Sequence, residues 1–318
     1  MAGGQERALR RRIKSVQSTK KITRAMELIA ATRVVKAQER ANAARPYSQQ
    51  ITNVILDLVG LGAQASHPLL REDHDANRSA FVVMTSDRGL CGAYNSAVIR
   101  AAERELVARQ AEGKDYALVL IGKKANSYFK FRNYDIAASF YDLTDRPDYE
   151  DARAVSEVVR NMFEAGDVDT VDLVYQRFLS AGSQEVVVRR FLPLETVDPN
   201  ADEPAEMHAS IEFDPSPEVI LDELLPRYVE ARLFAALLDA SASEHAARQR
   251  AMKAATDNAE ELIISLSRVM NRARQDAITG EIMEIVGGAE ALHQGQGADG
   301  PAIPAALLEP PSLVNRSA

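Results

Sequence analysis

The sequence lacks the features that define several large protein classes. Its 318 residues include one cysteine, Cys91, which excludes an internal disulfide framework and a zinc site built from several cysteines. No stretch approaches about 18 uninterrupted apolar residues, and the basic start of the chain has no apolar run behind it. We therefore expect a chain that spans no membrane and carries no standard secretion signal, with the cytoplasm as the default compartment.

Charge is distributed unevenly along the chain. Residues 1–48 hold twelve Lys or Arg against three acids, whereas residues 194–225 hold ten acids and no Lys or Arg. This segregation is typical of a protein that docks against charged partners. The basic segment could bind nucleic acid, but it shares its helix with an apolar stripe and lacks interleaved aromatic residues for base stacking. A charged protein surface is the favoured counterpart.

Both ends of the chain show helical periodicity over unusually long stretches. Near the start, apolar residues recur mostly three and four apart, through a possible kink at Arg45-Pro46, until Gly60; they include Leu9, Ile13, Val16, Ile22, Met26, Ile29, Val34 and Ala37. A second stretch begins at Pro217, or near residue 227 if Pro226 interrupts it. Sixty helical residues would reach roughly 90 Å, so such helices can bury their stripes only against each other or a partner. We expect an antiparallel coiled coil built from residues 1–76 and 208–292, followed by a flexible tail at 293–318.

The apolar period changes in the middle of the chain. Short apolar runs at 79–86 and 116–122 flank an amphipathic helix at 92–112, which predicts a strand, a helix and a strand. Later patterns predict helices at 123–132 and 149–165 and strands at 134–141, 171–178 and 185–192. The predicted fold class is therefore α/β, with a Rossmann-like domain over residues 77–196 inserted in the long antiparallel coiled coil.

The loop Asp87–Gly92 follows the first predicted strand, where α/β folds hold phosphates. It lacks both G-x-G-x-x-G and G-x-x-x-x-G-K-[ST], so a tight structural turn is favoured over a ligand site. Cys91 has no histidine in a catalytic pattern near it, and the acids of 194–225 form no calcium-binding loop. We expect no catalytic residue, cofactor or metal site.

The stretch 268–292 has apolar residues around much of its circumference, which calls for a surrounding partner because the N-terminal helix can cover only one side.

Three blocks of sequence resemble one family. The first is Ile13–Val16 with Lys21–Glu27 (IKSV and KITRAME), and the second is Ser86–Ala93 (SDRGLCGA). The third lies in the last helix and comprises Ser243-Glu244, Arg250–Ala259 (RAMKAATDNA), Asn271–Gln275 (NRARQ) and Ile278–Ala289 (ITGEIMEIVGGA). Their order, and the terminal pattern I-T-x-E-x-x-E-x-x-x-G-A, resemble the γ subunit family of the rotary F-type ATP synthase over about residues 5–292.

The resemblance implies a non-catalytic central shaft. It would rotate inside an α3β3 hexamer whose β subunits hold the catalytic sites, couple proton flow through the membrane sector to ATP synthesis and hydrolysis, and regulate catalytic activity. The implied partners are the α, β and ε subunits and the membrane c-ring, with no nucleic acid. The implied place is the cytoplasmic side of the cell membrane, held peripherally and without direct insertion.

The resemblance also assigns partner contacts by position. Contacts with a catch loop of the β subunit fall on Arg274, Gln275, Thr279 and Glu281. Positions facing carboxylate-bearing loops of the hexamer are Met26, Arg248, Lys20, Lys21 and Arg24. Contacts with the c-ring and ε fall on Phe213 and Asp214, and an apolar bearing tip comprises Ile282, Ile285, Val286, Ala289 and Leu292. Gly280 departs from the family, where a longer polar residue is common, at a cost of about 1 kcal/mol in helix propensity.

Overall fold

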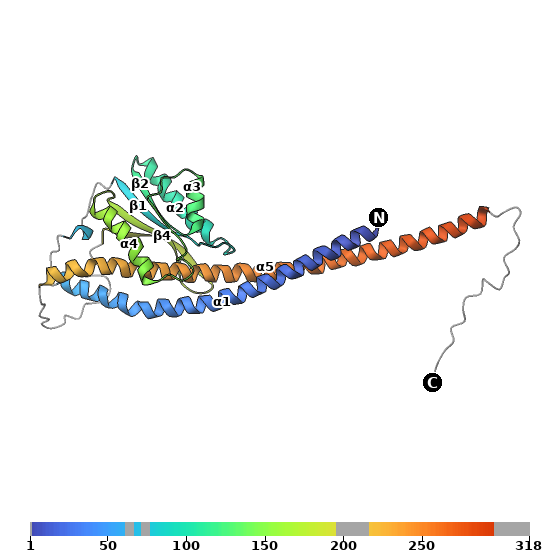
Figure 1. Ribbon diagram of the computed structural model, residues 1–318, viewed down its shortest axis with the longest axis horizontal. Coiled ribbons are helices and arrows are strands. Elements are labelled where there is room, and N and C mark those ends of the chain that lie inside the picture. Colours follow the sequence, from blue (N-terminus) through green and yellow to red (C-terminus); the bar gives the residue numbers. More distant parts are fainter. Residues whose placement is uncertain (1, 61–66, 71–76, 195–215, 296–318) are drawn as a thin grey trace, which may run out of the picture. The chain divides into compact units, whose positions relative to one another are not determined.

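The computed structural model describes residues 2–60, 67–70, 77–194 and 216–295 (Figure 1). In chain order the elements are α1 (Ala2–Gly60), η1 (Pro68–Leu70), β1 (Arg78–Met84), α2 (Tyr94–Ala111), β2 (Asp115–Ile121), α3 (Lys123–Phe131), β3 (Ala138–Phe140), α4 (Tyr149–Glu164), β4 (Thr170–Phe178), β5 (Gln184–Leu192) and α5 (Pro217–Gly295). They form two compact units, one from 2–19 with 259–295 and one from 20–258, so α1 and α5 each contribute to both.

Both long helices are continuous through their prolines. Helix α1 passes Pro46 and ends at Gly60, and α5 begins at Pro217 and passes Pro226. Because α5 runs to Gly295, the first three residues of the expected tail are helical. The rest of that tail, and residues 1, 61–66, 71–76 and 208–215 of the expected coiled-coil segments, lie outside the described residues.

Each long helix has a heptad seam, in which buried or half-buried residues alternate at spacings of four and three. On α1 the seam comprises Leu9, Ile13, Val16, Lys20, Thr23, Glu27, Ala30, Val34, Ala37, Ala41, Ala44, Ser48, Ile51, Ile55 and Leu58. On α5 it comprises Met252, Thr256, Ala259, Ile263, Leu266, Met270, Ala273 and Ala277. The hydroxyls of Thr23 and Thr256 lie 2.8 Å apart in a buried hydrogen bond between the two helices.

The seam corrects part of the predicted apolar stripe. Ile22 and Ile29 were expected to be buried, but their exposed fractions are 60% and 55%, while Thr23 and Ala30 are buried. A heptad repeat of 3.5 residues per turn carries the buried line through Thr23 and Ala30, one position later. Two large apolar residues are therefore left on the outer surface of α1.

The inserted domain is built on a five-stranded sheet in the order β3-β2-β1-β4-β5. Neighbouring strands are parallel except β4 and β5, which pair antiparallel. The α/β fold class and the Rossmann-like arrangement are thus confirmed. Strand β3 is shorter than the predicted strand at 134–141, because it pairs only with residues 119–121 of β2. Asn133, just before the predicted strand, adopts φ 58°, which is not a strand conformation.

Helices cover both faces of this sheet (Figure 1). One buried cluster joins β1 and β2 to α4 and to the ends of α1 and α5 nearest the domain, through residues such as Ile55, Val82, Phe163 and Leu225. The other joins the opposite face to α2 and α3, through Phe81, Leu106 and Phe129. The base of the helix pair therefore shares its apolar core with the α/β domain.

Gly122, between β2 and α3, is a point where the fold tolerates no side chain. It adopts φ +92°, and a Cβ there would lie 2.1 Å from the carbonyl oxygen of Thr85. We expect Gly122→Ala to lower the free energy of unfolding by about 3 kcal/mol or more. Gly113→Ala, at φ +72° with no atom within 4 Å of its Cβ, is the matched control and should cost about 1 kcal/mol. Equal urea midpoints for the two variants would contradict this account.

Candidate partner-binding surfaces

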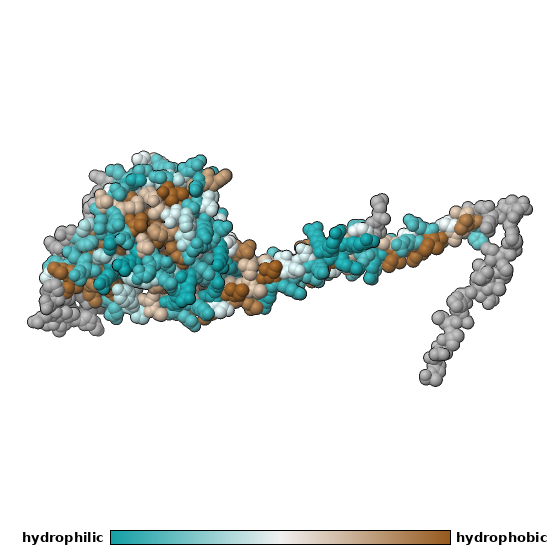
Figure 2. Space-filling view, in the orientation of Figure 1, coloured by the Kyte–Doolittle hydropathy of each residue, from teal (hydrophilic) through white to brown (hydrophobic). Residues whose placement is uncertain are grey.

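The end of α5 exposes a stripe of apolar side chains along one side of the helix. The seam stops at Ala277, and every residue from Ile278 to His293 is exposed. The exposed fractions of the expected bearing tip are 54% for Ile282, 71% for Ile285, 57% for Val286 and 70% for Leu292, and Ala289 is also exposed. Figure 2 shows hydrophobic residues gathered along this end of the helix. An exposed apolar stripe of this kind indicates a surface for a partner.

The four residues expected at a catch loop lie next to this tip. Arg274, Gln275, Thr279 and Glu281 are all exposed. Arg274 and Glu281 are seven residues apart and share one face of α5, whereas Gln275 and Thr279 are four apart and share a different face. All four lie within about two helical turns.

The basic part of α1 carries both charge and exposed apolar area. Lys21 and Arg24 are exposed, whereas Lys20 and Met26 are half-buried at or beside the seam. Nη1 of Arg24 lies 2.9 Å from both carboxylate oxygens of the half-buried Glu27, and because Arg24 itself is exposed the pair contributes little to stability.

Apolar residues off the seam accompany these basic side chains. Ile22, Leu28, Ile29 and Val35 have exposed fractions between 53% and 60%. Ile22 and Ile29 were expected on the buried stripe, and the apolar spacing did not identify Leu28 and Val35 as surface residues. The phase of the heptad repeat is the signal that identifies all four as surface residues.

Arg248 is not on the outer surface of α5. Its exposed fraction is 7%, and its guanidinium donates to Glu244 at 2.5 Å, to Nδ1 of His245 at 3.2 Å and to the carbonyl of Gly89 at 3.5 Å. Burial raises the pKa of Glu244, opposed by the Arg248 charge. The expected direct contact of Arg248 with a partner's carboxylates is therefore corrected to an internal ion pair.

The loop Asp87–Gly92 uses its polar groups within the chain. The Asp87 carboxylate accepts from the Thr144 hydroxyl at 3.1 Å and from the Lys123 amide at 3.1 Å. Cys91 is buried, and burial raises the pKa of its thiol. These bonds favour the structural turn over a phosphate site and leave Cys91 as a poor nucleophile.

Three potential metal ligands lie close together beside this loop. Atoms of Asp145, Glu244 and His245 are all within 4.8 Å of one another. Both carboxylates already bind guanidinium groups, Arg33 on Asp145 and Arg248 on Glu244. Two adjacent cations disfavour a metal ion there, so the donor set fits a charge network better than a metal centre.

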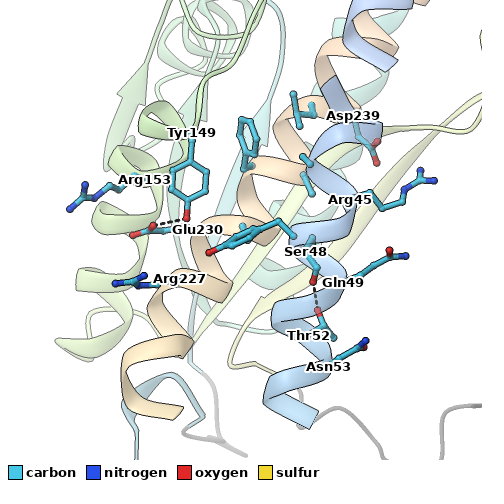
Figure 3. A pocket seen from close by; sticks show the side chains of 17 residues that line it. Arg45, Ser48, Gln49, Thr52, Asn53, Tyr149, Arg153, Arg227, Glu230 and Asp239 are labelled. Atoms are coloured by element: carbon cyan, nitrogen blue, oxygen red, sulfur yellow. Dashed lines mark hydrogen bonds between the residues drawn. The ribbon is translucent and has the colours of Figure 1, made fainter. Parts of the chain in front are cut away.

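A cleft of about 900 Å³ lies between α1, α4 and α5, within residues 20–258 (Figure 3). Tyr149 donates to Glu230 across it at 2.9 Å, and its ring meets that of Phe234 edge to face with centroids 5.6 Å apart. Burial raises the pKa of Asp239, at the rim, to about 6, although Arg177 and Arg45 oppose the rise. The residues that line the cleft include four small ones, Ala41 and Ala44 of α1 and Ala231 and Ala235 of α5.

The expected c-ring and ε contact and the expected lack of a membrane-spanning segment concern other parts of the chain. Phe213 and Asp214 lie outside the described residues. Among the helices that the structure describes, none has the length and apolar character needed to cross a membrane.

A family model described as ATP synthase matches residues 5–292. The chain is 50% identical over 299 residues to the ATP synthase gamma chain of Parafrankia sp., covering 92% of this chain and 99% of that one. It is 48% identical over 294 residues to the ATP synthase gamma chain of Kineococcus radiotolerans, covering 91% and 97% of the two chains. This chain belongs to the ATP synthase gamma chain family. A chain of the Euglena gracilis mitochondrial ATP synthase shares its fold with a TM-score of 0.67 at 19% identity, covering 95% of this chain and 99% of that chain.

In this gamma chain, the buried pair of Arg248 and Glu244 can be tested by removing one partner. Arg248→Met leaves the Glu244 carboxylate buried without its cation, so we expect the free energy of unfolding to fall by about 3–5 kcal/mol. Adding Glu244→Gln should recover most of this loss, because the remaining amide carries no charge. Urea unfolding at neutral pH measures both; a double variant no more stable than Arg248→Met would contradict the pairing.

The raised pKa of Asp239 predicts a pH-dependent contribution to the stability of this gamma chain. The folded pKa of about 6 exceeds the ordinary value of 3.8, so the folded state binds more protons between these values and stability falls as pH rises through this window. We expect Asp239→Asn to stabilise the chain by about 1 kcal/mol at pH 7, with the gain fading as the pH falls from about 6 to about 4. Asp222→Asn, at an exposed position of α5, is the control; a gain independent of pH would refute the assignment.

Proposed function

We propose that this chain acts as the rotating central stalk of an F-type ATP synthase, the gamma subunit of the F1 sector. It turns inside the α3β3 hexamer and couples proton flow through the membrane sector to ATP synthesis and hydrolysis, thereby regulating catalytic activity. The subunit is not an enzyme by itself, because the catalytic sites lie on the β subunits. The match over residues 5–292 carries this proposal.

The unpartnered end of α5 supports a bearing role. Its apolar residues are exposed and form one continuous stripe, which suits contact with a hydrophobic sleeve formed by the hexamer. Apolar contacts are non-directional, so a helix end can turn in such a sleeve without a deep energetic minimum at one angle. The bearing tip in this proposal comprises Ile282, Ile285, Val286, Ala289 and Leu292.

Polar contacts with the hexamer are proposed on two surfaces. Arg274, Gln275, Thr279 and Glu281 would meet the catch loop of a β subunit, which their exposure and their position within about two helical turns support. Lys21 and Arg24, with Lys20 and Met26 beside them, would face carboxylate-bearing loops. Exposed ion pairs contribute little individually, which suits contacts that must break at every step.

The remaining partners are the ε subunit and the c-ring. We propose Phe213 and Asp214 for this contact, supported by the ten acids of residues 194–225. The subunit would be held peripherally at the cytoplasmic side of the cell membrane through these partners. No nucleic acid or cofactor is part of the proposal.

Reconstitution tests the function directly. The chain is mixed with the α and β subunits of its own organism, and ATP hydrolysis is assayed with and without it. We expect activity that depends on the chain in a complex of about one gamma subunit to three α and three β subunits. A chain that neither joins the hexamer nor changes hydrolysis would contradict the proposed function.

The catch-loop assignment is tested in membranes that carry the intact complex. Arg274→Ala with Gln275→Ala should reduce coupled ATP synthesis by about tenfold, since charge-assisted bonds to the β subunit are lost, while assembly is little changed. Glu261→Ala, exposed on the same helix but more than three turns before Arg274, is the control. Wild-type synthesis by the double variant would refute the assignment.

A further inference from the structure

A short polar loop joins the α/β domain to both long helices. This junction loop, Thr144–Asp148, lies between β3 and α4, and α1, α5 and the end of β1 all bind it. All of these contacts fall within residues 20–258. The loop belongs to none of the surfaces assigned to partners above.

Helix α1 binds the junction loop through two arginines. Nη1 of Arg33 donates to both carboxylate oxygens of Asp145. Nη2 of Arg40 donates to the Pro147 carbonyl and, at 3.0 Å, to the Asp148 carboxylate. The arginines are seven residues apart and beside the seam, so the heptad that pairs the helices also places both guanidiniums on the face toward the loop.

Helix α5 binds the same loop from a second side. The Ser241 hydroxyl, at 3.3 Å, and Nε2 of His245, at 3.0 Å, both lie within hydrogen-bond distance of the Asp145 carbonyl. Nδ1 of His245 must accept from Arg248, because a guanidinium only donates, so the imidazole proton is on Nε2. Burial lowers the pKa of His245, which keeps the ring neutral and in this tautomer.

The sheet provides the third attachment. The Asp87 amide donates to the Thr144 hydroxyl at 3.2 Å, and that hydroxyl lies 3.1 Å from the Asp87 carboxylate, to which it donates. Asp87 follows β1 and also accepts from the Lys123 amide at the start of α3. The loop is thus fixed to the sheet at one end and to both helices along its length.

We propose that the junction loop is the torque coupling of the shaft, and that Arg33, Arg40 and His245 are positioning residues that make the α/β domain and the helix pair turn as one body. The proposal rests on the rotary function proposed above. The apolar core between the helices and the sheet resists separation of the two parts, but its contacts do not by themselves favour one angle as hydrogen bonds do. Hydrogen bonds and forked ion pairs depend on angle and therefore resist tangential displacement.

The test uses the complete complex in membrane vesicles and compares two activities of the same sample. ATP hydrolysis needs only the part of the shaft inside the hexamer, whereas ATP-driven proton pumping needs torque delivered to the other end. We expect Arg33→Ala with Arg40→Ala to keep hydrolysis within about twofold and to lower protons pumped per ATP by about tenfold, since the charge-assisted bonds to the loop are lost.

Lys123→Ala is the matched control. Lys123 forms an exposed ion pair of 2.6 Å with Asp142, just before the junction loop, but both ends of this pair belong to the α/β domain. If Lys123→Ala and the double variant Arg33→Ala with Arg40→Ala pump the same number of protons per ATP, the torque role is overturned. If the wild-type complex itself hydrolyses ATP without pumping protons, the proposed function fails instead, so the two failures are distinguishable.

A second variant covers the case in which the alanine pair does not assemble. Arg33→Asp should lower the pumping ratio, and adding Asp145→Arg restores the ion pair in reverse and should recover most of the loss. No recovery would overturn the proposal.

Spin labels provide a readout in the full chain without its partners. Cys91 is buried, so labels can be attached at Glu39→Cys on α1 and Ala108→Cys on α2, both exposed positions. In the alanine pair the distance distribution between them should broaden, while Lys123→Ala leaves it unchanged. If the distance distribution of the alanine pair is not broadened, the coupling role is overturned. The same holds if it is broadened but the number of protons pumped per ATP is normal.

Discussion

The heptad seam between α1 and α5 is the constraint on which the other features depend. It is narrow, because long parts of it consist of small or polar residues such as Thr23, Ala30 and Ala44. A narrow seam leaves large apolar residues on the outside, where Ile22 and Ile29 are exposed. Helix α1 therefore contacts α5 largely through small side chains and exposes large apolar ones to its surroundings. This arrangement suits a shaft that other subunits enclose.

The same seam determines where charged residues act. Arg33 and Arg40 lie beside it at one heptad spacing and reach the junction loop, whereas Lys21 and Arg24 point outward. Some basic residues of α1 thus bind the junction loop inside the chain, and others lie on its outer surface. The net charge of the N-terminal segment alone does not distinguish these two uses, but their position relative to the seam does.

Much of the fold was predictable because it follows from local periodicity. The long helices, the inserted α/β domain and the family blocks were all identified from spacing and motif. The phase of the seam was missed because Thr23 and Ala30 are less apolar than their neighbours Ile22 and Ile29, so hydrophobicity pointed one position away. The contacts of the junction loop could not be predicted for a different reason. Arg33 and Asp145 are 112 residues apart in the sequence, and no local pattern relates them.

The loop Asp87–Gly92 follows β1, a position where α/β folds often bind phosphate, yet it lacks the glycine patterns of phosphate-binding loops. Its internal hydrogen bonds account for this difference. Asp87 points its carboxylate at Thr144 and at the start of α3, and Gly89 offers its carbonyl to Arg248. Both groups would have to be released before the loop could bind a ligand. A phosphate site presents free amide donors, whereas this loop presents acceptors that are already used. The motif is therefore better explained by the need to attach a sheet to a rotating helix pair than by chemistry at the sheet edge.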